Sequence, residues 1–451
     1  MTKSSSKNRQ KIDTLIHSRW LATVNEENQL LERSALAIDD GVIVDLLPSA
    51  EASSRYRARE EVNLANHLLI PGLINAHGHS AMSLLRGFAD DLPLEAWLQE
   101  HIWPAEGQFV SEEFAYDGSL AAMAEMIRTG TTCFADMYFF PEATARAAQA
   151  VGMRAHLAPP VFDFPSNWQQ TPDAYLAATV ELREQLQDDP LITLGIGPHA
   201  PYTVSDDSFR KVLAVRERWP AAIHIHCQET AHEVSESLQQ YGLRPLARLQ
   251  QLGVLGPHTQ CVHMTQVNDE DIATLIETQA SVVHCPKSNL KLASGFCPVQ
   301  PLLEAGINVA LGTDSAASNN SLDMLSEMQY AALLAKAASG NASAVDAHTA
   351  LRLATINGAR ALGIADRVGS LEVGKQADIT AVKLDGPRQG PVYSPLSALV
   401  YTQTGSRVSD VWIAGRRQLA RGKLRHIDQD AVNARASHWH DKIANFAAGL
   451  S

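Results

Sequence analysis

Two closely spaced histidines follow an apolar stretch near residue 70. Residues 71–80 read PGLINAHGHS and come directly after the apolar run HLLI. Alternate side chains of an extended strand point to the same side, so His77 and His79 would face one point in space. Two imidazoles placed in this way can bind a metal ion, or they can be a hydrogen-bonded pair in a core. A metal ion would need further ligands from elsewhere in the chain.

Further candidate ligands come at the ends of other apolar runs. Residues 224–229 read HIHCQE, and residues 312–315 read GTDS. Taken singly, His226 is explained as an ordinary polar residue and Asp314 as a turn residue. Together with the first pair they would give three imidazoles and one carboxylate, a ligand set that favours zinc, with Fe²⁺ or another divalent ion as alternatives. The sequence therefore predicts a metal site.

The elements that would position these residues follow a regular pattern. From residue 65 on, eight short apolar or β-branched runs alternate with helical segments rich in Ala, Leu and Glu. This alternation predicts parallel strands, and eight repeats is the number in a closed (β/α)8 TIM barrel. Almost every run ends in His, Asp, Glu, Cys or Asn, and the carboxyl ends of barrel strands form the active site. An open doubly wound sheet has the same periodicity, but no GxGxxG follows the first strand.

Segments rich in β-forming residues lie on both sides of the predicted barrel. Turn signals such as Asp40-Gly41 punctuate them. Neither segment could form a core alone, so we expect the two to pair into one small β-sandwich. The predicted units are a disordered tail (1–11), the first part of the sandwich (12–68), the barrel (69–365), the second part of the sandwich (366–425) and a C-terminal helix (426–451).

Composition restricts the partners and the compartment. The net charge of −13 argues against a nucleic-acid partner, because phosphate binding needs clustered Lys and Arg. No apolar run approaches the roughly 20 residues that cross a bilayer, so we expect neither a membrane partner nor a signal peptide. The five cysteines are scattered and lack CxxC spacing. They predict reduced thiols in a cytoplasmic protein.

Several motifs together resemble the amidohydrolase superfamily. They are PGLINAHGHSAMSLLRG, HCQE, LGTDSAASNNSLDM and GSLEVGKQADI, and the resemblance runs from about residue 12 to residue 425. It implies that His77, His79, His226 and Asp314 are the metal ligands.

The resemblance also bears on the number of metal ions. Superfamily members with two metals bridge them with a carbamylated lysine at the end of strand 4. This chain has no lysine between Lys11 and Lys211. We therefore expect one zinc ion per chain, which fits deaminases better than dihydroorotase-like or urease-like hydrolases.

The resemblance implies roles for three residues in deamination. Glu229 matches the glutamate that shuttles protons, Asp314 would also accept the proton of the attacking water, and His263 would orient that water or stabilise charge at the attacked carbon. The predicted steps are attack of hydroxide on the amino-bearing carbon, protonation of the adjacent nitrogen by Glu229, and loss of ammonia. The alternatives are that Glu229 is an acid at a helix N-terminus and His263 a core histidine.

Substrate contacts are expected from the long segment between the first two strands. Residues 86–109 contain LEAWL and IWPAEGQ, which resemble the 5′-methylthioadenosine/S-adenosylhomocysteine deaminases of the superfamily. By that resemblance Glu106 binds the ribose 2′- and 3′-hydroxyls, Trp97 forms an apolar wall beside the 5′-thioether, and His199 contacts the nucleoside. Ser318, close behind the metal-binding aspartate, is a further expected contact.

One departure from the family pattern concerns the homocysteine carboxylate. Some members bind it with two arginines near strand 3, and Arg154 matches one of them. The following loop, residues 159–175, contains no Lys or Arg. We therefore expect methylthioadenosine to be a better substrate than S-adenosylhomocysteine, and adenosine is a further candidate substrate.

Other functions stay open at this point. Guanine deaminase, cytosine deaminase and s-triazine chlorohydrolase are rivals on the same scaffold, but their substrates have no cis-diol for Glu106 to bind. A scaffold protein without catalysis would be expected to have lost metal ligands. A homo-oligomer, either a dimer or a tetramer, is plausible for the superfamily.

Overall fold

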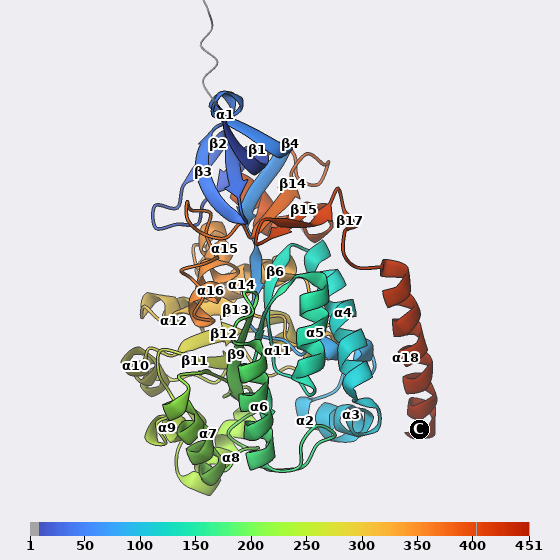
Figure 1. The fold of residues 1–451 in the computed structure, drawn as a ribbon. Helices are drawn as coiled ribbons and strands as arrows, with labels where there is room; N and C mark the ends of the chain where they lie inside the picture. Colours follow the sequence, from blue (N-terminus) through green and yellow to red (C-terminus); the bar gives the residue numbers. More distant parts are fainter. Residues whose placement is uncertain (1–8, 403, 451) are drawn as a thin grey trace, which may run out of the picture.

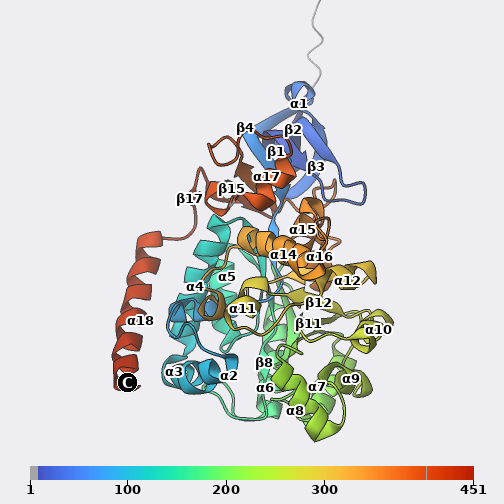
Figure 2. The ribbon, with the colours of Figure 1, turned by 180° about the vertical axis from the view of Figure 1, so that it is seen from behind.

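The computed structural model describes residues 9–402 and 404–450. A β-rich domain lies at one end of the molecule, the barrel lies below it, and the C-terminal helix α18 (Gln429–Leu450) runs along one side (Figures 1 and 2). Within the described ranges, no helix is both long and apolar enough to span a membrane.

The larger part is a parallel barrel, as predicted. Among the described residues its strands follow one another in chain order around the sheet, and each neighbouring pair is parallel. The strands are β5 (Leu73–Asn75), β6 (Thr131–Asp136), β7 (Arg154–Leu157), β9 (Ile192–Pro198), β10 (Ala222–Cys227), β11 (Thr259–His263), β12 (Ser281–His284) and β13 (Val309–Leu311). A short strand, β8 (Pro160–Val161), also pairs with β9.

Backbone hydrogen bonds join the last barrel strand to the first. Just beyond β5, the amide of Ala76 donates to the carbonyl of Leu311 (2.9 Å), and the amide of Asp314 donates to the carbonyl of His77 (3.1 Å). A side chain at Gly312 would place its Cβ 2.8 Å from the Cβ of His77. The glycine therefore allows the close approach that brings Asp314 beside the first histidines.

Helices cover the outside of the barrel. Several begin at a Ser, Thr, Asn or Asp whose side chain accepts a backbone N–H, which stabilises a helix by about 1 kcal/mol. The helices of the barrel part are α4 (Glu112–Arg128), α5 (Pro141–Val151), α6 (Pro172–Leu186), α7 (Asp206–Arg218), α8 (Ala231–Tyr241), α9 (Pro245–Gln251), α10 (Asp269–Thr278), α11 (Pro286–Lys291), α12 (Val299–Glu304), α13 (Ala316–Asn319), α14 (Met324–Ser339), α15 (Ala347–Leu353) and α16 (Ile356–Ala361).

The two chain ends form one mixed sheet, which confirms the predicted pairing of the flanking segments. β4 and β14 join them in antiparallel fashion, and the strand order is β17-β16-β15-β14-β4-β1-β2-β3. The strands are β1 (Gln10–Ala22), β2 (Leu30–Asp39), β3 (Val42–Pro48), β4 (Tyr56–Pro71), β14 (Ile379–Lys383), β15 (Val408–Ile413), β16 (Arg416–Ala420) and β17 (Lys423–Leu424). The domain also contains α1 (Ser49–Arg55), α17 (Pro395–Tyr401) and η3 (Gly405–Arg407). Most of the predicted disordered tail lies outside the described residues, and β1 begins at Gln10.

The segment between β5 and α4 lies beside the carboxyl ends of the strands. It contains η1 (Ser80–Leu85), α2 (Leu94–Ala96), η2 (Trp97–Ile102) and α3 (Trp103–Phe109). α18 packs against α3 and α4. Its Trp439 packs edge-on against Phe114 and donates from Nε1 to Asp117 (3.0 Å). The C-terminal helix therefore supports the layer of helices that covers the site.

Candidate active site

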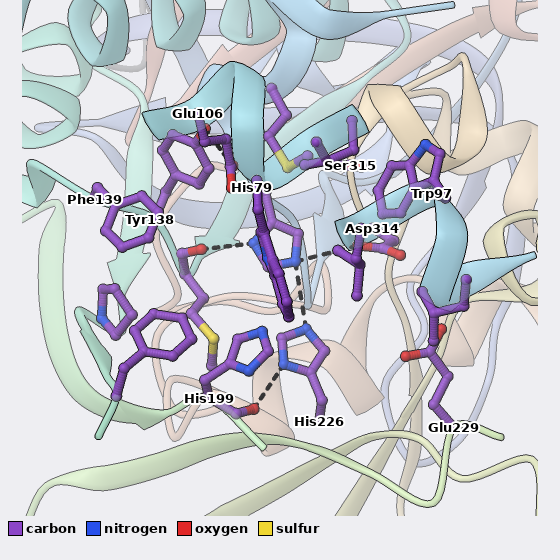
Figure 3. Close-up of a pocket in the computed structure, with 18 of the residues that line it drawn as sticks. His79, Trp97, Glu106, Tyr138, Phe139, His199, His226, Glu229, Asp314 and Ser315 are labelled. Atoms are coloured by element: carbon purple, nitrogen blue, oxygen red, sulfur yellow. Dashed lines mark hydrogen bonds and ion pairs between the residues drawn. The ribbon is translucent and has the colours of Figure 1, made fainter. Parts of the chain in front are cut away.

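The four predicted metal ligands converge at the carboxyl end of the barrel. His77 and His79 follow β5, His226 lies in β10, and Asp314 follows β13. Asp314 Oδ1 lies 3.4 Å from His77 Nε2 and 3.3 Å from His79 Nε2, and His226 Nε2 lies 3.4 Å from His79 Nε2. Figure 3 shows His79 between Asp314 and His226. Residues from distant parts of the chain thus face one point.

The donor atoms fit a divalent metal ion. His77 Nε2 is buried and has no hydrogen-bond partner among the described residues. It faces two other imidazole nitrogens and a carboxylate oxygen, and a buried polar atom without a partner is costly. Three imidazoles with one carboxylate are suitable zinc ligands, and a cation would satisfy all four atoms together. The site therefore has the chemistry of a metal centre.

Further hydrogen bonds orient three of these ligands. His79 Nδ1 donates to the carbonyl of Met137 (2.6 Å), and His226 Nδ1 donates to the carbonyl of His199 (2.8 Å). Because a carbonyl only accepts, the proton of each ring is on Nδ1, and Nε2 is free to bind an ion. Asp314 Oδ2 accepts hydrogen bonds from the hydroxyls of Ser288 (2.6 Å) and Ser318 (2.9 Å). Oδ1 of Asp314 is thereby left facing the histidines.

The backbone at the site adopts an uncommon conformation. Asp314 has φ 58° and His263 has φ 75°, both in the left-handed region that non-glycine residues seldom occupy. Such conformations persist where the surrounding structure holds them and concentrate at functional sites. Here they turn the Asp314 and His263 side chains at the ends of β13 and β11 into the cavity.

Glu229 lies in the same cavity, beside His263. Its Oε2 is 3.7 Å from His263 Nε2, and its Oε1 accepts a hydrogen bond from Ser294 Oγ (3.3 Å). Burial raises the pKa of Glu229, and the neighbouring His263 opposes this rise. His263 Nδ1 contacts the amide oxygen of Asn289 at 2.8 Å and must donate to it, so Nε2 faces Glu229. A buried carboxyl with a raised pKa is suited to carry a proton at neutral pH.

A second carboxylate holds the turn that carries Glu229. Glu233 accepts hydrogen bonds from the backbone amides of Gln228 (3.0 Å) and Glu229 (2.7 Å). The sequence reasoning did not single out Glu233. Its place in the first turn of α8 is nevertheless typical of such a role, because the N–H groups at a helix start have no partner within the helix.

The expected substrate residues fall into two groups. Trp97, Glu106 and His199 line the cavity. Glu106 Oε1 accepts a hydrogen bond from the hydroxyl of Tyr138 (2.7 Å). Burial raises the pKa of Glu106 to about 7, although the Tyr138 hydrogen bond lowers it. Burial lowers the pKa of His199 to about 3, so its imidazole is neutral at physiological pH.

Two expected substrate contacts lie elsewhere. Arg154 is at the start of β7, away from the cavity, and its guanidinium pairs with buried Asp378 next to β14 (3.0 Å). Ser318 is buried behind Asp314 and donates its hydroxyl to that carboxylate, and Ser315 is the neighbouring serine that lines the cavity. In this structure Arg154 joins the two domains and Ser318 orients a predicted metal ligand, so their contact with substrate stays a prediction that this arrangement does not support.

The remaining lining is mainly apolar and aromatic. Among the described residues, no lysine or arginine lines the cavity. Phe162 packs against Phe139, Phe164 and His199, with ring centroids 4.6–5.8 Å apart. The cavity therefore combines a polar end, with the histidines and carboxylates, and an aromatic wall (Figure 3). The sequence reasoning missed Tyr138 and this aromatic cluster, because no single motif marks them.

Comparison with known proteins agrees with this arrangement. The amidohydrolase family model matches residues 68–417. A protein of Teredinibacter turnerae named 5-methylthioadenosine/S-adenosylhomocysteine deaminase is 49% identical over 96% of this chain and 98% of its own. A protein of the same name from Saccharophagus degradans is 48% identical over 97% of this chain and 98% of its own.

Solved structures share the fold. An adenosine deaminase from Xanthomonas campestris with bound zinc superposes with a TM-score of 0.96 and 46% identity, covering 97% of this chain and 100% of the other. An atrazine chlorohydrolase from Arthrobacter aurescens with zinc has a TM-score of 0.88, covering 94% and 99%, but only 22% identity. The second likeness concerns the fold alone.

Proposed function

The chain belongs to the amidohydrolase family, and we propose that it is a hydrolytic deaminase of adenosine-type nucleosides. The preferred substrate is 5′-methylthioadenosine, which would give 5′-methylthioinosine and ammonia. The observation that carries the proposal is that the histidine–aspartate cluster, Glu229 and Glu106 line one cavity or lie directly against it. The names of the relatives that are up to 49% identical support the same reaction.

We propose that the site holds one zinc ion per chain, bound by His77, His79, His226 and Asp314. Such an ion, when bound, lowers the pKa of a water molecule from about 16 toward 7 and so supplies a nucleophile at neutral pH. The absence of a lysine between Lys11 and Lys211 supports a single ion, because the chain has no residue for a lysine bridge at the end of the fourth strand.

The proton transfers fall to residues of this chain. Asp314 Oδ1 accepts a proton from the attacking water, and Glu229 donates a proton to the ring nitrogen next to the amino-bearing carbon. His263 Nε2 lies beside the Glu229 carboxylate and stabilises negative charge that develops near the attacked carbon. The proton that Asp314 took from water passes to the amino group, and the carbon–nitrogen bond breaks to release ammonia. The hydroxyl on the attacked carbon returns its proton to Glu229 as the carbonyl forms, so that water and the nucleoside give an inosine-type product and ammonia.

The cavity walls support the choice of substrate. A carboxylate can accept hydrogen bonds from both ribose hydroxyls, and Glu106 is placed in the cavity by its bond to Tyr138. The aromatic wall around Phe162 suits an apolar 5′-thioether. The carboxylate of S-adenosylhomocysteine would find no lysine or arginine among the described lining residues, and an unpaired buried charge is costly. Methylthioadenosine is therefore the better substrate.

The setting of the enzyme is part of the proposal. The five cysteines are buried and unpaired, which supports a reducing, cytoplasmic location. The net charge of −13 supports a small-molecule substrate and neither a nucleic-acid nor a membrane partner. A homo-oligomer rests on the family resemblance alone, and sedimentation analysis of the purified chain tests it.

An ammonia-release screen tests the proposed reaction. Zinc-loaded protein is given methylthioadenosine, adenosine, S-adenosylhomocysteine, guanine, cytosine and s-triazines in parallel. We expect the highest kcat/KM with methylthioadenosine. Faster release from a free base or a triazine would contradict the nucleoside assignment, because neither has a cis-diol.

A further inference from the structure

We infer that His224 and Gln260 are positioning residues for the metal site, although neither lines the cavity. A chain of three hydrogen bonds through these residues fixes the orientation and the protonated nitrogen of His77. This inference rests on the metal site of the proposed function and goes beyond its ligands.

The chain of hydrogen bonds runs from the ligand cluster across the barrel. His77 Nδ1 lies 2.7 Å from His224 Nε2, and His224 Nδ1 lies 3.0 Å from Gln260 Oε1. Gln260 Nε2 donates to the carbonyl of Ala361 (2.6 Å). The side chains come from the end of β5, from β10 and from β11, and Ala361 is the last residue of α16. All four residues are buried.

The direction of every bond follows from the carbonyl of Ala361. This oxygen only accepts, so Gln260 presents its NH₂ to it and its Oε1 to His224. His224 Nδ1 must then donate a proton, which leaves His224 Nε2 as an acceptor in the neutral ring. His77 Nδ1 must in turn donate to that acceptor. The proton of His77 is therefore on Nδ1, and Nε2 is bare toward the other ligands.

His77 differs from the other two histidine ligands because its Nδ1 proton depends on an acceptor side chain. His79 and His226 donate from Nδ1 to backbone carbonyls, which no substitution of an acceptor side chain removes. The acceptor for His77 is a side chain. Without His224, the Nδ1–H of His77 would lose its buried partner, and the proton could move to Nε2, where it would block the ion.

The chain of hydrogen bonds ends at the carbonyl of Ala361 because this oxygen needs a partner. The last carbonyls of a helix have no partner within the helix, and this one is buried at the end of α16. The Gln260 amide satisfies it and is thereby held in one orientation. The end of α16 thus determines which ring nitrogen of His77 is available to the metal.

The zinc dissociation constant of His224→Phe, measured by competition with a chromophoric chelator, tests this inference. Loss of a residue that supports a metal ligand typically weakens binding by about 10- to 100-fold, and we expect that range. The amide of His224→Gln can accept from His77 and donate to Gln260, so it should recover part of the affinity. Gln260→Leu should weaken zinc binding less than His224→Phe, because it acts through His224.

His156→Phe is the matched control. His156 is a buried histidine of another barrel strand, β7, which pairs with β6 and β9, and its Nδ1 contacts Thr193 Oγ1 (2.9 Å) rather than a metal ligand. It should leave zinc affinity unchanged. Nitrogen-15 NMR of the wild-type imidazoles should show both His77 and His224 protonated at Nδ1.

Several results would overturn the inference. Wild-type zinc affinity in His224→Phe, or an equal loss in His156→Phe, would show that the chain does not position His77. If His224→Phe does not fold, as judged by circular dichroism, Gln260→Leu decides the matter, and unchanged zinc binding there would overturn the inference. Failure of the wild type to bind zinc would instead overturn the metal site and this inference together.

Discussion

The carboxylate of Glu106 is the group that we expect to bind the ribose, and Glu106→Leu removes it while keeping an apolar side chain of similar size. Two hydroxyl hydrogen bonds to a charged group contribute about 1.5–3 kcal/mol each. Their loss, about 3–6 kcal/mol in all, corresponds to a fall in kcat/KM for methylthioadenosine of about 140- to 20,000-fold. The zinc content should not change, because Glu106 contacts Tyr138 and none of the predicted ligands.

The assay compares methylthioadenosine with its 2′,3′-dideoxy analogue in wild type and variant. The wild type should prefer the diol strongly, and Glu106→Leu should lose that preference, because neither substrate then has a carboxylate to bind. Tyr138→Phe is the control, since it keeps Glu106 and removes only its hydrogen-bond donor. An equal loss of kcat/KM on both substrates would refute the ribose assignment and would indicate a structural effect.

Three further predictions concern the shuttle, the pH dependence and the C-terminal helix. Glu229→Gln should keep its zinc by elemental analysis and lose ammonia release by about 100- to 10,000-fold, and retained turnover would contradict the shuttle role. Because burial raises the pKa of Glu106 to about 7 and the ionised form binds the diol, KM for nucleosides should rise as pH falls through 7. Glu106→Gln should lack that rise, and a rise in KM that persists in this variant would show that another group causes it. Trp439→Ala should lower the free energy of unfolding by about 3–5 kcal/mol in a denaturant titration, whereas exposed His440→Ala should not.

Strand periodicity and strand ends made the convergence of the candidate metal ligands predictable. The spacing of His77 and His79 and the barrel pattern together place side chains at one rim, because the carboxyl ends of parallel barrel strands share one face. The structure brings His226 and Asp314 to the same point. Glu229 could be predicted for a related reason, since it follows β10 by two residues.

Residues that act through tertiary contacts were less predictable. Arg154 has the charge needed for a substrate carboxylate, but its partner Asp378 comes 224 residues later and depends on how the two domains pack. Ser318 is directed by the short helix α13 toward Asp314 rather than toward the cavity. His224 lies in the same HIH motif as His226, yet only the barrel interior shows that it contacts His77.

The most direct test of the account is a crystal structure of the zinc-loaded protein with anomalous data collected at the zinc absorption edge. We expect a single peak within about 2.0–2.2 Å of one nitrogen each of His77, His79 and His226 and of one oxygen of Asp314. Two peaks at this rim would contradict a single ion per chain. A peak elsewhere, with these four side chains free of metal, would contradict the proposed chemistry as a whole.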